Sequence, residues 1–238
     1  VMCTVSFLPL GNNDFILSSN RDINLSRKPA EMPDFEDYHG ARLLYPRDGE
    51  AGGTWIGIRD NHRIVCLLNG AFVMHEWRPP YRKSRGIVVK DALSATDPIA
   101  FFEGYDLHGI EPFTLLLVDW EDGSLTFYEW VWDEERRHIK MLPIAPAIWS
   151  STPLYDEGMK ALRRSWFHNW YQQQTSYTME GIRKWHLETG EGDPITDLVT
   201  KRGFLETVSL TSIEKRDEQT RIKYLDLIHQ EESERLFT

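Results

Sequence analysis

The chain has 238 residues, of which 41% are apolar, and its 37 Asp and Glu against 27 Lys and Arg give a formal net charge of −10. Nine Trp, nine Tyr and eleven Phe supply enough apolar surface for a packed core and exclude an intrinsically disordered chain. The longest apolar run, residues 113–118, is far shorter than the ~18 residues of a membrane-spanning helix. The acidic balance excludes a general nucleic-acid binder, which needs a positive surface.

The chain contains two cysteines, Cys3 and Cys66, which are too few for a disulfide scaffold. Residues 1–17 contain no Lys or Arg and are interrupted by polar residues at 12–14, so they do not resemble a secretory signal. We therefore expect a cytoplasmic protein in which both thiols are reduced.

The first half of the sequence predicts hairpins, because short apolar runs alternate with turn-forming residues. The strongest turn signal is the Asp-Gly pair within residues 121–123. An edge strand is expected at 139–142, and helices at 85–93 and 99–104. The expected strand pairs are 4–8 with 15–19, 54–58 with 63–68, and 113–120 with 125–132.

The second half predicts helices followed by one more hairpin. A helix over 154–174 would begin at Thr152-Pro153, a second would cover 179–187, and a third would run from Asp193-Pro194 to Gly203. The closing strands are 205–213 and 221–229, joined by a polar loop at 214–220. Strands, then helices, then strands favour an α+β fold with mainly antiparallel sheets. Because no linker is visible, we expect a single domain over residues 1–238.

Cys3 is the first residue that could take part in catalysis. A cysteine at a mature N-terminus has a base beside it, since the α-amino group has an ordinary pKa near ~8 and can accept the thiol proton. The alternative is that Cys3 is simply a small apolar residue at the start of a strand. For Cys66, inside the apolar run 64–68, we expect only that packing role.

Three polar residues, Asn20, Arg21 and Asp22, follow the apolar run of the second expected strand. In an extended chain Asn20 and Asp22 share one face while Arg21 points to the other, so all three can serve one site only if the strand ends or bulges here. The alternative is a solvated turn. The predicted hairpin would bring these residues back beside Cys3.

Other candidates are less specific. Asn69 follows a strand and could stabilise an oxyanion through its amide, or could form part of a turn. The basic and aromatic stretch 77–85, which includes Arg85, could receive an anionic ligand, or could be an exposed loop before a helix that starts at Ser84. The eight histidines lack metal-ligand spacing, so neither a metal nor a cofactor is expected.

Six short motifs follow one another over residues 2–116, within a stretch of family-like sequence that extends to about residue 162. Each is weak alone, but their order makes chance agreement improbable. They are Met2-Cys3-Thr4-Val5, Asn20-Arg21-Asp22, Gly52-Gly53-Thr54-Trp55-Ile56-Gly57, Leu68-Asn69, Ser84-Arg85-Gly86 and Phe113-Thr114-Leu115-Leu116.

In this order the motifs resemble the NRDE family, also called the transport and Golgi organisation protein 2 family. The resemblance implies a four-layer αββα sandwich of N-terminal-nucleophile hydrolase type. It also implies a similarity to cysteine amidases that cleave bile-salt conjugates and penicillin V. By that analogy Cys3 would attack an amide carbonyl, Arg21 would favour the thiolate and Asp22 would orient the α-amine. Asn69 would help to hold the oxyanion.

The candidate ligand-binding residues are Asn20, Trp55 and Arg85. The expected partner is a small-molecule substrate or ligand, and no oligomeric state is predicted.

The sequence departs from the family pattern at Ile23, where the family has Glu, and at Ser150-Ser151, in the area where related amidases use an Asn. In addition, Val1 and Met2 would have to be removed to expose the amine of Cys3. Two hypotheses therefore stay open: a hydrolase of C–N amide bonds, and a non-catalytic protein that binds or carries haem or another small molecule.

Overall fold

The computed structural model describes residues 2–121, 123–152 and 155–237, and the side chains from residue 4 onward within these ranges. These residues form two seven-stranded antiparallel sheets and four helices. The chain divides into two compact units. We call residues up to 27 together with 145–236 the terminal unit, and residues 28–144 the central unit. The single domain expected over 1–238 stays a prediction.

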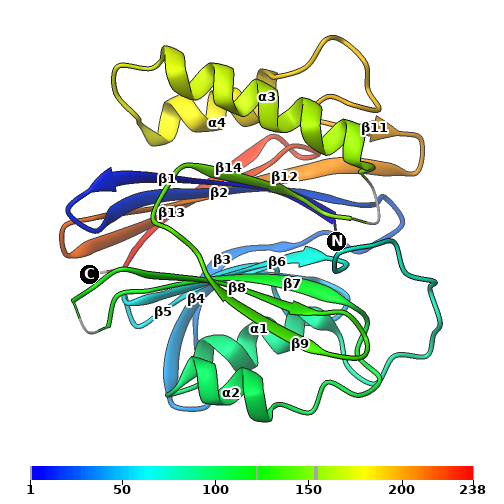
Figure 1. Cartoon of the computed structure of the whole chain (residues 1–238), viewed down its shortest axis with the longest axis vertical. Coiled ribbons are helices and arrows are strands. Elements are labelled where there is room, and N and C mark those ends of the chain that lie inside the picture. Colours follow the sequence, from blue (N-terminus) through cyan, green and yellow to red (C-terminus); the bar gives the residue numbers. More distant parts are fainter. Residues whose placement is uncertain (1, 122, 153–154, 238) are drawn as a thin grey trace. The chain divides into compact units, whose positions relative to one another are not determined.

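The terminal unit contains one sheet whose strand order is β10-β1-β2-β12-β13-β14, with β11 paired to β12. Helices α3 (Glu157–Gln173) and α4 (Met179–Glu188) lie over one face of this sheet (Figure 1). The strands are β1 (Met2–Gly11), β2 (Asp14–Asn24), β10 (Ala147–Ser150), β11 (Lys201–Arg202), β12 (Leu205–Arg216), β13 (Gln219–Asp226) and β14 (Glu231–Phe237).

An apolar layer joins these helices to the sheet. Alternate residues of a strand share one face, and residues three or four apart share one side of a helix, so each element supplies one apolar stripe. Strands β1 and β2 contribute Leu8 and Ile16, and α4 contributes a stripe that includes Trp185. The whole cluster is Leu8, Ile16, Phe167, Met179, Ile182, Trp185 and Leu198.

The central unit contains the second sheet, in the order β3-β4-β5-β6-β7-β8-β9. Helix α1 (Arg85–Ser94) packs against β4, β5 and β6, and α2 (Pro98–Gly104) packs against α1 (Figure 1). The strands are β3 (Glu31–Tyr38), β4 (Ala41–Arg47), β5 (Ile56–Arg59), β6 (Arg63–Asn69), β7 (Phe113–Asp119), β8 (Thr126–Trp132) and β9 (Arg137–Met141).

A close backbone contact joins the start of α1 to the loop before β5. A Cβ atom on Gly53 would lie 2.4 Å from the carbonyl carbon of Gly86, closer than real contacts allow. We expect Gly53→Ala to lower the free energy of unfolding by ~1–3 kcal/mol, as overpacking does in well-packed interiors. Urea denaturation of Gly104→Ala provides the control, because nothing lies within 4 Å of a Cβ atom there. Equal stability of the two variants would contradict this prediction.

The expected hairpins are confirmed. Strands β1 and β2, β5 and β6, and β7 and β8 pair antiparallel, and β9 is an edge strand beside β8. Helices α1, α2 and α4 also lie where they were predicted. The residue at 122, in the predicted Asp-Gly turn, lies outside the described part of the chain.

Two predicted boundaries of the second half are wrong in detail. Helix α3 begins at Glu157 rather than 154, because the side chain of Asp156 caps it by accepting a hydrogen bond from the Met159 amide. Pro153, expected in its first turn, lies outside the described residues. The predicted loop 214–220 is shorter, since β12 continues to Arg216 and β13 begins at Gln219.

The helix predicted from Asp193 to Gly203 does not form. One turn forms at Asp193, and the chain then extends into β11, which pairs with β12. The carbonyl oxygens of Thr196 and Asp197 accept hydrogen bonds from Arg163, so they do not receive the amides that a helix would supply.

Candidate functional site

The β1–β2 hairpin returns the Asn-Arg-Asp motif to the start of the chain. In its register Cys3 lies opposite Arg21, and Met2 lies opposite Asp22. The predicted contact of the Cys3 sulfur with Arg21 or Asp22 lies outside the described side chains. The backbone neighbours of Cys3 are therefore the residues that sequence reasoning proposed as its partners.

The motif alternates across the sheet as the strand period predicts. Asn20 and Asp22 contact residues on the helix side, His186 and Tyr155, whereas Arg21 lies near Tyr224 of β13. Strand β2 continues through the motif to Asn24, and the irregularity is a bulge in its partner β12. Asp22 pairs with Thr207 and Arg21 with Ser209, which leaves Val208 as the extra residue.

Asp22 is a fully buried carboxylate with two neutral donors. The hydroxyl of Tyr155 donates to its Oδ2 at 2.7 Å, and the hydroxyl of Thr207 donates to its Oδ1 at 2.7 Å. Burial raises the pKa of Asp22, while these two hydrogen bonds and the charges of Arg163 and Arg202 act against the increase. Burial and the neighbouring carboxylate likewise raise the pKa of Tyr155. A carboxylate can accept about four hydrogen bonds, so Asp22 retains capacity for a further donor.

Arg163 supplies the cation of this cluster, and its side chain is buried. Its guanidinium donates to the Thr4 hydroxyl at 2.6 Å and to the carbonyl oxygens of Thr196 and Asp197. The guanidinium carbon lies 3.7 Å from the centre of the Tyr155 ring. One side chain of α3 thus ties β1 to the loop before β11.

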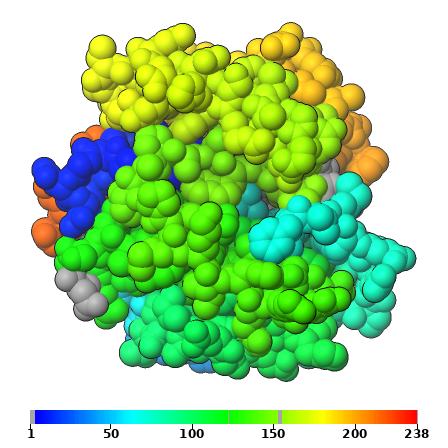
Figure 2. All heavy atoms as spheres, viewed as in Figure 1, coloured from blue at the N-terminus to red at the C-terminus, as the bar shows by residue number. Residues whose placement is uncertain are grey.

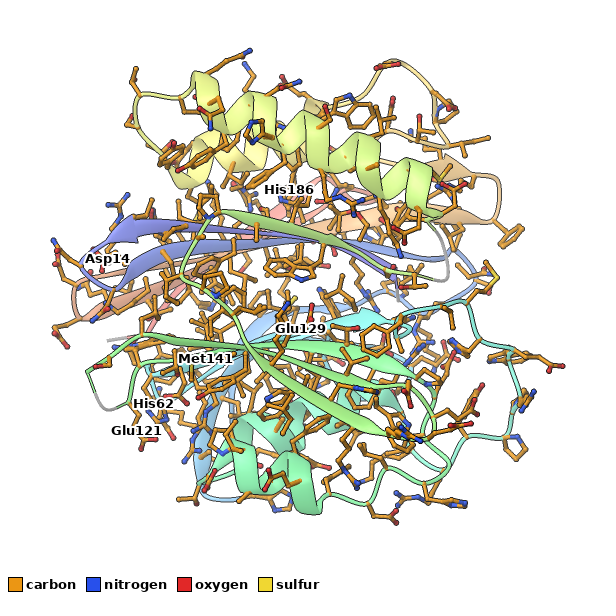
Figure 3. All side chains as sticks on the ribbon, viewed as in Figure 1. Asp14, His62, Glu121, Glu129, Met141 and His186 are labelled. Carbon is orange, nitrogen blue, oxygen red and sulfur yellow. The ribbon has the colours of Figure 1, made fainter. Side chains whose placement is uncertain are left out.

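Asn20 forms a second buried link, to α4. Its side-chain nitrogen donates to the carbonyl oxygens of His186 and Leu198, so its Oδ1 is the acceptor for Nδ1 of His186 at 2.7 Å. The His186 proton is therefore on Nδ1, and Nε2 accepts from the Ser6 hydroxyl at 2.7 Å. Figure 3 shows His186 between the helices and the sheet of this unit. The ligand contact expected for Asn20 stays a prediction, and here its amide has a structural role.

Burial gives His186 an unusually low pKa. Its ring is completely buried, which lowers its pKa to about 3, and the charges of Arg183 and Arg163 act in the same direction. The imidazole is neutral at physiological pH and accepts the Ser6 hydrogen bond. This chain of Ser6, His186 and Asn20 has the order of a hydrolytic triad, but all three members are buried.

Arg21 is also completely buried, although on the other face of the sheet. Burial raises the pKa of Tyr224, and the positive charge of Arg21 opposes that increase, so the two groups lie within electrostatic range. The register makes Cys3 the position directly opposite this guanidinium.

The other candidates belong to the central unit. Asn69 ends β6 and is 5% exposed, and its Oδ1 has no hydrogen-bond partner among the described residues. Arg85 donates to the carbonyl oxygen of Pro112 and pairs with Glu111 at 2.8 Å. Trp55 is 1% exposed, and its carbonyl oxygen accepts from the Leu67 amide. Ligand contacts of Trp55 and Arg85 stay predictions.

The basic stretch before α1 is largely paired with carboxylates. Its cations contact acidic side chains at 2.8–3.1 Å, and Ser84 caps α1 by accepting from the Gly86 amide. The prediction that this stretch is an exposed loop before a helix that starts at Ser84 is therefore confirmed. The pairs are Arg78–Glu76, Arg82–Asp106, Lys83–Asp91 and Arg85–Glu111.

Sequence reasoning missed Tyr155, Arg163, His186 and Thr207. A signal existed for two of them. Arg163 stands four residues after Met159 and four before Phe167, on the apolar stripe of α3, and His186 stands beside Trp185 at the end of the stripe of α4. A polar residue at a buried helical position needs buried partners, so such positions indicate polar contacts within the core.

The described residues contain no group of three His, Cys, Asp or Glu that could hold a metal ion. Within the same part of the chain, no helix combines the length and apolarity needed to cross a membrane.

Known structures share this fold. A variant of conjugated bile acid hydrolase from Clostridium perfringens aligns with 98% of this chain and 92% of its own, at 10% identity and a TM-score of 0.58. The Caenorhabditis elegans ortholog of N-acylethanolamine-hydrolyzing acid amidase aligns over 89% and 92%, at 13% identity and a TM-score of 0.58. Penicillin V acylase from Agrobacterium tumefaciens aligns over 95% and 86%, at 11% identity and a TM-score of 0.50.

The two antiparallel sheets and four helices of the described residues thus define a mixed α+β protein with an N-terminal-nucleophile hydrolase-like fold. The chain belongs to the Transport and Golgi organisation 2 family, whose sequence profile matches residues 2–189. No curated protein sequence matches the chain significantly.

Proposed function

We propose that this protein hydrolyses a C–N amide bond of a small molecule. Cys3 would be the nucleophile after removal of Val1 and Met2 has made it the first residue. The observation that carries the proposal is the register of the β1–β2 hairpin, in which Cys3 lies opposite Arg21 and the preceding position lies opposite Asp22. The fold shared with amide-hydrolysing proteins supports it. At 9–13% identity that likeness concerns the fold alone.

Arg21 would favour the thiolate of Cys3. Directly opposite positions of an antiparallel pair share one face of the sheet, about 4.5–5.5 Å apart at Cβ. Thr4 contacts Arg163 on the helix side, so the alternate position 3 belongs to the other face, on which Arg21 also lies. A buried guanidinium on the same face lowers the free energy of a thiolate relative to the thiol.

Asp22 would hold the α-amine. When Cys3 is the first residue, its amino group replaces the peptide bond that follows position 2, the position opposite Asp22. The carboxylate has two hydrogen bonds and capacity for another, and a cationic donor would offset part of its burial. Tyr155 and Thr207 would then be positioning residues that fix the carboxylate.

The reaction follows from these roles. The sulfur of Cys3 attacks the carbonyl carbon, and the α-amine takes the thiol proton and passes it to the departing amine nitrogen as the C–N bond breaks. Water then hydrolyses the thioester and restores the thiol. The role of Asn69 as an oxyanion donor stays a prediction from the sequence.

A second candidate function is non-catalytic: the protein would bind or carry a small molecule such as haem. The observation that favours it is the buried Ser151, 2% exposed, in the segment for which the resemblance to amidases implies an Asn. Loss of that amide removes one donor for an oxyanion and leaves binding unaffected.

The test is the N-terminus and reactivity of the native protein. We expect the intact mass to show a chain that begins at Cys3. We also expect iodoacetamide to label this residue at pH 7 about tenfold faster than a free cysteine, because a lowered pKa increases the thiolate fraction. Measuring the labelling rate from pH 5 to 9 gives the apparent pKa of the thiol.

Two variants provide the controls. Cys3→Ala should lose the rapid labelling, and Cys66→Ala should keep it, since Cys66 is completely buried. A native chain that retains Met2, or a Cys3 that reacts at the rate of free cysteine, would contradict catalysis and favour the binding function.

A further inference from the structure

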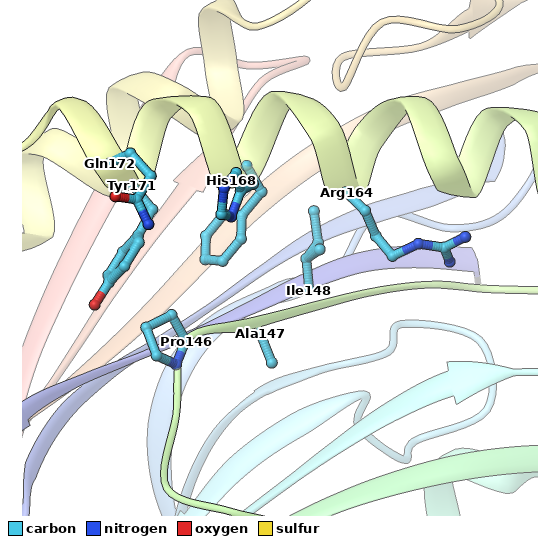
Figure 4. A pocket seen from close by; sticks show the side chains of 8 residues that line it. Pro146, Ala147, Ile148, Arg164, His168, Tyr171 and Gln172 are labelled. Carbon is cyan, nitrogen blue, oxygen red and sulfur yellow. The ribbon is translucent and has the colours of Figure 1, made fainter.

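A pocket of about 440 Å³ lies between α3 and the strand β10, within the terminal unit. One wall is β10, from which the Ile148 side chain points toward α3, and the other consists of α3 residues that include His168 and Tyr171 (Figure 4). Phe167 also lines the pocket. Its volume falls within the ~300–1,000 Å³ range of small-molecule sites. Figure 2 shows the face of the molecule on which α3 (yellow-green) is exposed.

The pocket has an apolar interior. Phe167 belongs to the core cluster between the helices and the sheet, and Ile148 and Tyr171 pack against that cluster. An apolar group that enters between α3 and β10 would therefore continue the core, and it would gain ~25 cal/mol for each Å² of apolar surface removed from water.

One end of the pocket is cationic. Arg164 lines it, and its side chain is 54% exposed; within the described part of the chain its one ion pair is to Glu157, at 3.9 Å. Glu157 has a closer partner in Lys160, at 3.0 Å. His168, one helical turn after Arg164, also faces the pocket (Figure 4). In a chain of net charge −10, a guanidinium without a close carboxylate favours an anionic ligand.

The dimensions favour a small molecule over a peptide. Strand β10 has four residues, all paired with β1, so only a short edge is available for an added strand. The pocket is compact and has one cationic end, which suits a ligand with one apolar body and one negative group.

We propose that this pocket binds a small amphipathic monocarboxylate, with the apolar body between Phe167 and Ile148 and the carboxylate on Arg164. The site uses none of the residues proposed for amide hydrolysis, so the inference does not depend on the proposed function. A ligand here would stabilise the packing of α3 on the edge of the sheet.

Isothermal titration calorimetry with dodecanoate, below its micelle concentration, tests this site on the full chain. We expect saturable binding at one site, weakened about tenfold or more in Arg164→Gln, because a charge-assisted hydrogen bond is lost. Lys184→Gln is the matched control: it removes the same charge from α4, where the side chain is 72% exposed, and we expect less than about a twofold change.

Two further measurements separate head-group recognition from apolar binding. Methyl dodecanoate, which lacks the negative charge, should bind about tenfold or more weakly than dodecanoate. Ile148→Trp, whose larger side chain would occupy the space between β10 and α3, should abolish binding of both, and circular dichroism would verify its fold. Cys3→Ala should bind dodecanoate normally, so failure of this site and failure of the amidase proposal are distinguishable.

Three outcomes would overturn the inference. They are the absence of saturable dodecanoate binding, equal affinities of Arg164→Gln and Lys184→Gln, and methyl dodecanoate binding as tightly as dodecanoate.

Discussion

Arg163→Ala is expected to lower the free energy of unfolding by ~3–5 kcal/mol, the largest stability effect that we predict. The substitution removes the buried guanidinium and leaves the carbonyl oxygens of Thr196 and Asp197 without these donors. It also removes the cation whose charge acts on the buried carboxylate of Asp22. Urea denaturation monitored by tryptophan fluorescence measures the change.

The neighbouring residue provides the control. Arg164→Ala makes the same substitution one position along α3, where the side chain is 54% exposed, so we expect a change within ~0.5 kcal/mol. Arg163→Lys should recover only part of the loss, because an ammonium cannot span the same set of acceptors. Equal stabilities of Arg163→Ala and Arg164→Ala would show that the buried network contributes little.

The second large effect is a loss of stability on acidification, caused by His186. In the folded protein burial lowers its pKa to about 3, against an ordinary value of 6.5 in the unfolded chain. Above about pH 7.5 the residue is neutral in both states and contributes no pH dependence. As the pH falls below 6.5 only the unfolded state takes up the proton, so stability falls, at up to ~1.4 kcal/mol per pH unit.

Asp22 acts in the opposite direction. Burial raises its pKa in the folded state, so the folded protein takes up this proton first as the pH falls, and that uptake is stabilising. The contribution of His186 must therefore be isolated by comparison with a variant that does not titrate at this position.

His186→Gln provides that comparison. We expect it to be less stable than the parent at pH 7, since one amide cannot replace both the Ser6 and the Asn20 contacts. Between pH 7.5 and 5 the difference in the free energy of unfolding should narrow by about 2 kcal/mol, as the parent alone loses stability through this residue. Denaturant titrations at half-unit intervals would detect it. A difference that stays constant with pH would show that His186 is not buried as a neutral ring.

The hairpins were predictable because their signals are local. Alternating apolar residues around a turn specify two strands and their pairing, as in β1–β2 and β7–β8. Strands β3 and β14 carried no such signal. Their sequences are acidic, most of their residues are exposed or only partly buried, and they become strands by pairing with a neighbour.

The helix predicted at 193–203 failed for the opposite reason. Its start signal was real, since the Asp193 carboxylate accepts from the Ile195 amide. Arg163 lies 33 and 34 residues before Thr196 and Asp197, and its guanidinium binds the carbonyl oxygens that a helix would need. Local capping was thus overridden by the requirements of a buried cation.

The sequence by itself determined the class of fold, the family and the alternation of the Asn-Arg-Asp motif, because strand periodicity and motif order are carried by neighbouring residues. Only the tertiary structure decided which groups that motif meets. Tyr155 and Thr207 reach Asp22 from 133 and 185 residues away, and His186 reaches Asn20 from 166. Such contacts arise because buried polar groups must find partners, and the partners available depend on how the whole chain packs.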